Sequence, residues 1–422
     1  MTRFRLGARE TFRSFGIRNF RLFFGGQLIS QIGNWLTLIT QTLLVLKLTG
    51  NGFAVGLLTA CQFAPVLVVG AWAGLVADRS DKRRLLMIVQ IVAMAQSFAL
   101  AGLAFMGNPP VVAIYGVALI GGVAIAFDNP ARRAFVVEMV PEDHVHNAVS
   151  LNSALMTSAR VVGPALAGLL IHVAGYGWCF TLDALSYLAV LAGLWMMRTG
   201  ELRPSPIAER AKGQVRAGLR YARRVPELWV PLVMMAVIGT LAFNFQVTMP
   251  LLVERTFHGN EATFTLLFSV LSIGSLAGAL ATARRRTISV RHVVVTATGF
   301  GAAMLVFAAS PNLAASFPLG LALGATSIAF MTASTAIVQV ESAPQMRGRV
   351  LALQAIVFLG STPIGGPIIG ELCDVFGPRA GFVAGGAATL AAAGWGLLAA
   401  RARAAHEVPT TGVGVGDAVP VA

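Results

Sequence analysis

The feature that most constrains this chain is a series of long apolar blocks separated by short charged segments. Twelve blocks run through the 422 residues, and each matches the ~20 residues that a helix needs to cross a bilayer. Continuous runs of this length exclude a transmembrane β-barrel, whose strands alternate in character over about ten residues. The predicted spans are 20–46, 53–77, 85–106, 110–128, 148–173, 177–197, 229–253, 261–282, 292–309, 313–338, 350–373 and 380–400.

Composition agrees with an all-α membrane protein. Hydrophobic residues make up 56% of the chain and charged residues 12%, against about 25% charged residues in soluble proteins. The net charge of +14 lies mostly at the ends of the blocks. It therefore indicates membrane topology, and we expect no nucleic-acid partner.

Lysine and arginine divide unequally between the two sides that twelve spans define. With a cytoplasmic N-terminus, 28 of the 32 lie inside: up to residue 21 and in 79–84, 132–133, 198–224, 284–291, 347–349 and 401–403. Three lie outside (Lys47, Arg255 and Arg379), and Arg160 falls within a span. This bias follows the positive-inside rule. It predicts a multi-pass protein of the inner (cytoplasmic) membrane with both termini in the cytoplasm.

Short motifs recur at an offset of 203 residues. Glu138 recurs as Glu341, and Gly163 with its proline recurs as Gly366 with Pro367. A repeat of this length predicts two parallel six-helix halves, a known plan for transporters with one central path. We expect a cytoplasmic N-terminal tail at 1–19, halves at 20–197 and 229–400, a basic cytoplasmic linker at 198–228 and a disordered cytoplasmic tail at 401–422.

The linker contains a stretch at 209–224 that we expect to be helical. Its basic side chains can rest on anionic lipid headgroups, as amphipathic interfacial helices do. A solvated linker explains the same residues equally well. Membrane lipids are the partner that the first alternative predicts.

The most specific motif lies in the loop after the second span. It has Gly74, three further residues, Asp78-Arg79, and the basic pair Arg83-Arg84. Glycine permits close helix approach, and an aspartate at a membrane border can bind arginines or cap a helix. The motif resembles the loop signature of the major facilitator superfamily. The resemblance implies the major facilitator fold and a gating role for these five residues, as a latch on the cytoplasmic side.

Two departures from that signature stand out. Asp81 occupies the position of the family's second glycine, which puts the loop geometry in question. Ala281 stands where the repeat would place the acid of the second half, so we expect the latch in the first half only.

The stretch from Asp128 through 152 resembles the drug/proton antiporter-like branch that contains macrolide and enterobactin exporters, and the resemblance covers roughly residues 15–403. Gly163 and Pro164 resemble the antiporter motif of export branches. The resemblance implies proton-coupled export of amphipathic small molecules such as drugs or a siderophore. A facilitator or importer of the same fold, and a non-transporting membrane sensor, remain the alternatives.

Charged residues inside spans are the next candidates. Arg160 lies near the middle of span 5, where an arginine costs at least about 2.5–3.5 kcal/mol on insertion scales. It must face a cavity or a partner, and Asp183 in span 6 is either that partner or a structural residue. Asp128, Arg160, Gly163, Pro164 and Asp183 are therefore our candidates for coupling or helix shaping.

Uncharged polar residues recur on one face of span 1, at helical spacing. They line a substrate path, or else they form hydrogen bonds between helices. The path candidates are Gln27, Gln31, Asn34 and Gln41, with Asn244 and Gln246 in span 7 and Gln354 in span 11.

The sequence limits the energy sources that transport can use. The chain has no phosphate-binding Walker motif, so transport must use an ion gradient or run downhill. The family resemblance implies protons, with Asp128, Asp183 and Glu371 as possible carriers. Histidine and cysteine spacing indicates neither a metal site nor a catalytic constellation. We expect no enzyme activity, no cofactor and a monomer.

Overall fold

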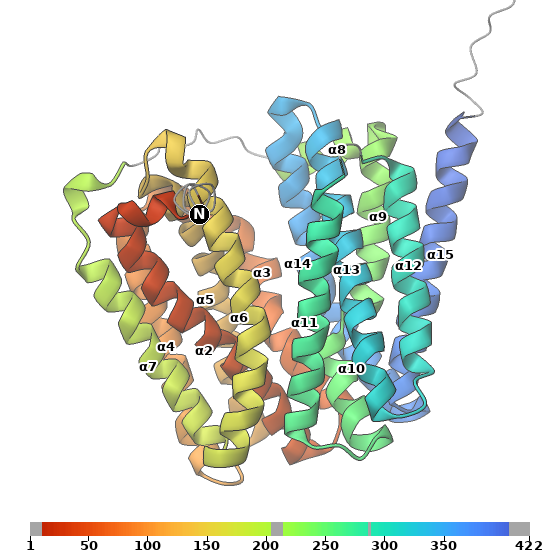
Figure 1. Cartoon of the computed structure of the whole chain (residues 1–422), viewed down its shortest axis with the longest axis horizontal. Helices are drawn as coiled ribbons and strands as arrows, with labels where there is room; N and C mark the ends of the chain where they lie inside the picture. Colours follow the sequence, from red (N-terminus) through yellow and green to blue (C-terminus); the bar gives the residue numbers. More distant parts are fainter. Residues whose placement is uncertain (1–10, 204–213, 286–287, 405–422) are drawn as a thin grey trace, which may run out of the picture.

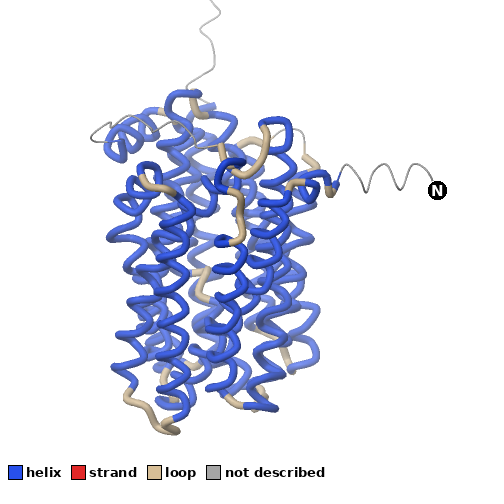
Figure 2. Tube along the Cα trace, turned by 90° about the vertical axis from the view of Figure 1, so that its left-hand side faces the viewer, coloured by secondary structure: helices blue, strands red, loops and turns tan. Residues whose placement is uncertain are grey.

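The structure is a computed structural model that describes residues 11–203, 214–285 and 288–404. Over these residues it is helical and contains no strand (Figure 2). Twelve helical segments are long and apolar enough to cross a membrane, which confirms the all-α fold class and the predicted number of spans.

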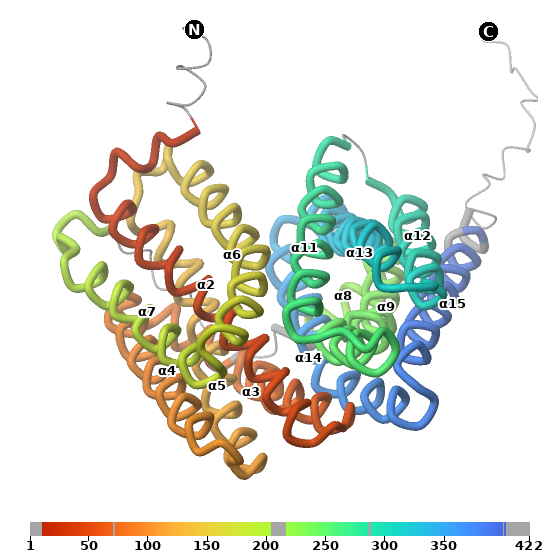
Figure 3. Tube along the Cα trace, turned by 60° about the horizontal axis from the view of Figure 1, so that its bottom comes forward, coloured from red at the N-terminus to blue at the C-terminus, as the bar shows by residue number. Residues whose placement is uncertain are grey.

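The helices form two groups that lie side by side (Figures 1 and 3). The first half comprises α2 (Arg18–Thr49), α3 (Gly52–Arg79), α4 (Lys82–Phe105), α5 (Val111–Glu138), α6 (Val145–Ala174) and α7 (Tyr176–Trp195). The second comprises α9 (Pro226–Leu241), α10 (Phe245–Leu251), α11 (Glu261–Ala283), α12 (Val290–Ala308), α13 (Leu313–Glu341), α14 (Pro344–Phe376) and α15 (Pro378–Ala404).

A short helix, α8 (Gln214–Arg224), lies between the halves in sequence and overlaps the predicted 209–224 helix; residues 204–213 are outside the described part. Ala222 is fully buried and packs with Leu228 and Val350. The Tyr221 hydroxyl accepts a hydrogen bond from the backbone N–H of Ala343 at 3.1 Å. One face of α8 is therefore docked on the second half, while Arg220, Arg223 and Arg224 are exposed.

We call the end of the molecule that carries α8 the linker end, and the end that carries the α2–α3 turn at Gly50 the far end (Figure 1). Helices α3, α5 and α7 run from the far end to the linker end. The helix α15 reaches Ala404, so the predicted tail at 401–422 begins inside a helix. Its remaining residues, 405–422, lie outside the described part.

The fourth span extends ten residues beyond its predicted end at 128. The polar residues that suggested a loop are paired within the helix or with its neighbour. Arg132 pairs with Asp128 at 3.0 Å, and Lys82 of α4 pairs with Glu138 at 2.8 Å, both largely buried. Because paired charges can remain buried, the helix continues past Pro130 to Glu138.

The seventh span is broken rather than continuous. Helix α9 ends at Leu241 and α10 begins at Phe245. Asn244 lies in the break and donates to the backbone carbonyl of Thr240 at 2.7 Å. Irregular backbone at membrane depth is tolerated when such groups satisfy it within the protein. The predicted linker also ends early, because α9 begins at Pro226.

Candidate functional site

The two halves meet most closely at the far end, where α3 crosses α14. Gly52 and Gly56 form a small-xxx-small pair on α3, and Gly366 and Gly370 form another on α14. A Cβ atom built on Gly56 lies 2.7 Å from the Pro367 nitrogen, and one built on Gly366 lies 2.9 Å from the Gly56 carbonyl oxygen. Such paired glycines let helix backbones touch within a membrane. The spacing was visible in the sequence, but we did not predict this contact.

A charged clasp covers this crossing. The Asp374 carboxylate accepts hydrogen bonds from the backbone N–H groups of Gly52 (2.8 Å) and Phe53 (2.9 Å), so it caps α3 from the other half. Arg255 pairs with Asp374 at 2.8 Å and donates to the Gly50 carbonyl. A carboxylate at a helix N-terminus is stabilised by the free N–H groups and the helix dipole. The clasp therefore fastens α3 to α14 at the far end.

A second seam joins α6 to α11 at the same end. Gly168 of α6 packs directly against Thr265 of α11. The Tyr176 hydroxyl donates to the Glu261 carboxylate at 2.7 Å. Both seams between the halves are thus closed at the far end.

The linker end is different. A Cβ atom built on Gly74 meets no described atom within 4 Å. Asp78 is exposed and has no ion pair or hydrogen bond among the described residues. In Figure 1 the halves draw apart toward this end. The close approach that we expected of Gly74 does not exist in this conformation, because no helix of the other half reaches it.

Other residues of the gating loop form hydrogen bonds within the first half. Arg83 donates to the backbone carbonyls of Leu194 (2.6 Å) and Trp195 (3.3 Å) at the end of α7. Asp81 accepts from the Arg84 N–H at 3.1 Å and caps α4. The cap explains why an aspartate can replace the family glycine, since the position has a φ of −60°. Arg79 is exposed, and the gating role of the motif stays a prediction.

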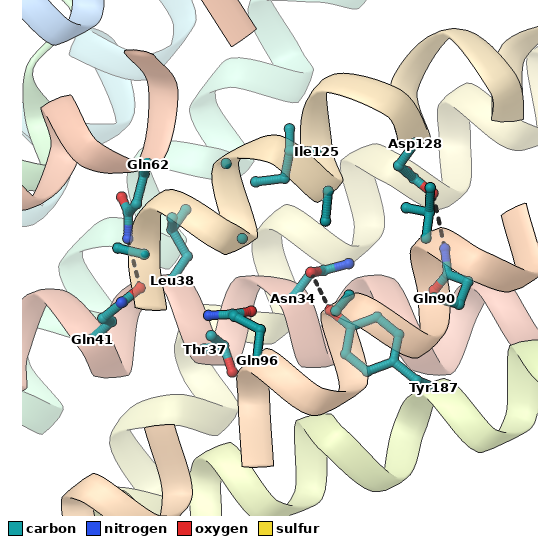
Figure 4. Close-up of a pocket in the computed structure, with 16 residues that line it drawn as sticks. Asn34, Thr37, Leu38, Gln41, Gln62, Gln90, Gln96, Ile125, Asp128 and Tyr187 are labelled. Carbon is teal, nitrogen blue, oxygen red and sulfur yellow. Dashed lines mark hydrogen bonds between the residues drawn. The ribbon is translucent and has the colours of Figure 1, made fainter. Parts of the chain in front are cut away.

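A polar cavity lies inside the first half (Figure 4), with an empty volume of about 580 Å³ including its mouth. Three hydrogen bonds join residues of its lining. Tyr187 donates to Asn34 at 2.8 Å, Gln62 to Gln41 at 2.8 Å, and Gln90 to Asp128 at 2.8 Å. Of its polar lining residues, Asn34 and Gln41 are among the predicted path residues and Asp128 is a coupling candidate, whereas Gln62, Gln90, Gln96 and Tyr187 were missed.

Asp183 is fully buried next to this cavity. Its Oδ2 accepts hydrogen bonds from Thr37 of α2 and Ser97 of α4, both at 2.7 Å. Thr37 also lines the cavity. No cation pairs with Asp183 among the described residues, so the alternative in which it pairs with Arg160 does not hold. It joins α2, α4 and α7 through hydroxyl groups instead.

Arg160 contacts an aromatic ring rather than an acid. Its guanidinium lies 5.5 Å from the ring centroid of Trp35 in α2. Gly163, one turn further along α6, packs directly against Trp35, which explains why this position excludes larger side chains. Trp35 in turn lies 6.3 Å from the Phe268 ring of the second half. Pro164 is buried on the same helix.

The other predicted path residues form hydrogen bonds with nearby side chains or are half-buried. Gln31 donates to Gln27 at 3.2 Å, and Gln354 donates to Ser334 and Thr335 at 3.3 Å. Gln246 is half-buried. A groove on α13 opens beside Thr335 and is lined by Ile328, Met331, Thr332, Thr335, Ala336 and Gln339. That the seven residues line a substrate path stays a prediction.

The known proteins that this chain resembles in sequence are transporters. The chain is 25% identical to the staphyloferrin A transporter of Staphylococcus aureus, over 85% of this chain and 90% of that one. It is 27% identical to the multidrug efflux pump Tap of Mycolicibacterium fortuitum (83% and 88% covered). It is 22% identical to macrolide efflux protein A of Streptococcus pyogenes (82% and 87% covered).

Solved structures of transporters have the same fold as this chain. A bacterial homologue of the human lysosomal transporter Spinster, solved in an inward-facing and unoccupied conformation, superposes with a TM-score of 0.73 at 15% identity, over 91% of this chain and 96% of that one. A D-xylose–proton symporter superposes with a TM-score of 0.72 at 14% identity (91% and 97% covered). The model of the transmembrane secretion effector family matches residues 10–410. The chain is therefore a multi-pass membrane transporter of small molecules, not an enzyme, and it belongs to the transmembrane secretion effector family of the major facilitator superfamily.

Proposed function

We propose that the protein exports amphipathic small molecules from the cytoplasm across the inner membrane by alternating access, coupled to proton entry. The linker end, with both termini, faces the cytoplasm in this proposal, in line with the distribution of lysine and arginine. The observation that carries it is the contrast between the fastened far end and the separated linker end. A protein whose halves are joined at one end only can exchange this state for its mirror state.

Two relatives support export over import, because their names describe efflux. Amphipathic cargo fits the groove on α13, whose lining combines apolar side chains such as Met331 with the hydroxyl and amide groups of Thr335 and Gln339. Pockets of this mixed character accept many ligands. A facilitator or importer of the same fold would share the architecture but lack the coupling tested below.

Asp183 is the acid that we assign to proton coupling. Asp128 already neutralises Arg132, and Glu371 is exposed. Asp183 is buried, has no cationic partner among the described residues, and touches the polar cavity through Thr37. A buried carboxylate without a cation is stabilised by binding a proton. Binding of that proton would change the hydrogen bonds between Asp183 and the hydroxyl groups of three helices.

The test uses purified full-length protein in liposomes. The cargo is the compound best tolerated by a pump-deficient strain that expresses the protein, from a panel of macrolides, tetracyclines, dyes and siderophores. We expect wild type, with its linker end outside, to concentrate this compound only when the lumen is acidic. Asp183→Asn should lose concentrative uptake yet retain counterflow exchange, because exchange needs no net proton movement.

The matched control is Asp81→Asn, which makes the same change at an exposed cap and should keep wild-type coupling. Uptake that ignores the imposed pH gradient in wild type would rule out proton antiport and favour a facilitator. Normal concentrative uptake by Asp183→Asn would exclude Asp183 as the carrier. Absence of any transport with every compound would favour a non-transporting sensor.

A further inference from the structure

We propose that Arg160 binds the carboxylate of an amphipathic organic anion, so that the cargo of this transporter is an apolar molecule bearing an acidic group. The inference rests on the proposed function for its transport step, but it concerns a binding site that can be tested without transport.

The first observation is the unpaired charge. Arg160 lies near the middle of α6 and has neither an ion pair nor a hydrogen bond among the described residues. Its Nε is buried without a partner, whereas its two terminal nitrogens are not enclosed. The Trp35 ring offers a cation–π contact, worth roughly as much as one ordinary hydrogen bond. The guanidinium fork itself has no acceptor.

The second observation is where the fork lies. One stripe of α6 passes through Val149, Ser153, Thr157, Arg160 and Pro164, at steps of three and four residues. Exposure falls steadily along it: Val149 and Ser153 are exposed, Thr157 and Arg160 half-buried, Pro164 buried. One turn further, Gly168 touches α11 of the second half. Arg160 therefore lies between the exposed part of this stripe and the contact of α6 with the second half.

The chemistry of these groups selects the ligand. Buried donors without acceptors are costly, and an arginine fork matches the two oxygens of a carboxylate. The half-buried Trp35 supplies an aromatic surface beside the fork. A molecule with one acidic group and an apolar body satisfies both features. A neutral or cationic compound leaves the arginine unpaired.

The experiment compares two probes that differ in one group, 1-pyrenebutyrate and 1-pyrenebutanol. Binding to full-length protein in lipid nanodiscs is measured by fluorescence anisotropy. We expect wild type to bind the carboxylate about tenfold more tightly than the alcohol, or more, as a charge-assisted hydrogen bond provides. Arg160→Gln should reduce this preference to about one, and Arg160→Lys should retain part of it, because lysine keeps the charge but not the fork.

The matched control is Arg133→Gln, which removes an exposed arginine from α5 and should leave the preference unchanged. Equal affinity of wild type for the two probes would overturn the proposal. So would a preference that survives in Arg160→Gln. If Arg160→Gln does not insert, Arg160→Lys decides, since an undiminished preference there contradicts recognition by the fork. Because binding is measured without transport, these outcomes are independent of whether export is proton-coupled.

Discussion

The two ends of α3 have similar residues, but only the far end is in contact with the other half of the molecule. At the far end, Gly52 and Gly56 lie against the backbone of α14, and an aspartate from the other half caps the helix. At the linker end, Gly74 has open space beside it and Asp78 has no partner among the described residues. Each end of α3 thus combines a glycine with an acid, which α14 supplies at the far end and α3 itself at the linker end, and only the far end is engaged.

This contrast indicates how a rocking transporter can stabilise each of its states. Glycine crossings bring backbones close but are individually weak, and a partly exposed ion pair adds little. A seam of this kind can open again at modest cost, which a deeply interlocked core could not do. In our proposal, the unengaged motif at the linker end forms the corresponding contact when the far end opens.

The largest expected effect comes from adding a side chain at the crossing. In Gly56→Leu the new atoms meet the backbone of α14, so the far end cannot close. Overpacking costs about 1–3 kcal/mol, which predicts transport lower by roughly 5- to 150-fold. The measurement is transport in liposomes together with maleimide labelling of a cysteine placed at Ser153, in a background without Cys61.

The matched variant is Gly74→Leu. Its side chain meets nothing in the present state, so labelling at position 153 should stay high, whereas Gly56→Leu should lower it. The contrast between the two ends would fail if both variants shifted labelling in the same direction.

The next effect concerns the free acid at the linker end. Asp78→Asn should reduce transport by about tenfold or more, since charge-assisted hydrogen bonds contribute about 1.5–3 kcal/mol, here in the state closed at the linker end. Thermal stability should not change, because Asp78 is exposed and unpaired among the described residues. Transport rates and detergent melting curves measure the two. Wild-type rates in this variant would remove Asp78 from the gate.

Weakening the clasp should have a smaller effect. Asp374→Asn removes the charge that Arg255 meets, and it leaves one of the two backbone N–H groups of α3 without its acceptor. The side chains are 16% and 30% exposed, so solvent screening limits the loss to roughly 1 kcal/mol, or a few-fold in the equilibrium between states. Distances between spin labels across the far end should then show a larger open fraction. An unchanged distribution would mean that the glycines alone hold this end.

Much of the fold could be predicted because membrane helices must satisfy their own backbone and show as apolar blocks. The fourth span was predicted too short because its polar residues are paired. Asp128 pairs with Arg132 one turn away, and Glu138 pairs with Lys82 of α4, so α5 stays helical past residue 128. Spacing within one segment cannot show the second of these pairs.

The candidate site was predictable by residue type more than by role. Arg160 was recognised as an unusual charge, but its contact with Trp35 depends on how α6 crosses α2. The far-end clasp was missed because Asp374 and Arg255 each look like ordinary charges at a block end. Their importance comes from the α3 terminus that they meet, more than 200 residues away in the case of Arg255.

The smallest effect tests whether the linker-end loop depends on its family glycine. Asp81→Ala removes the cap of α4 and should lower the free energy of unfolding by about 1 kcal/mol, whereas Asp81→Gly should cost only a few tenths. Neither should alter transport at saturating cargo, because the polar contacts of Asp81 within the described part of the chain are with Arg84 of α4. Melting curves and transport rates of both variants measure this. A marked loss of transport in Asp81→Gly would mean that the aspartate takes part in the gate itself, and the linker end would then hold two functional acids where the far end has one.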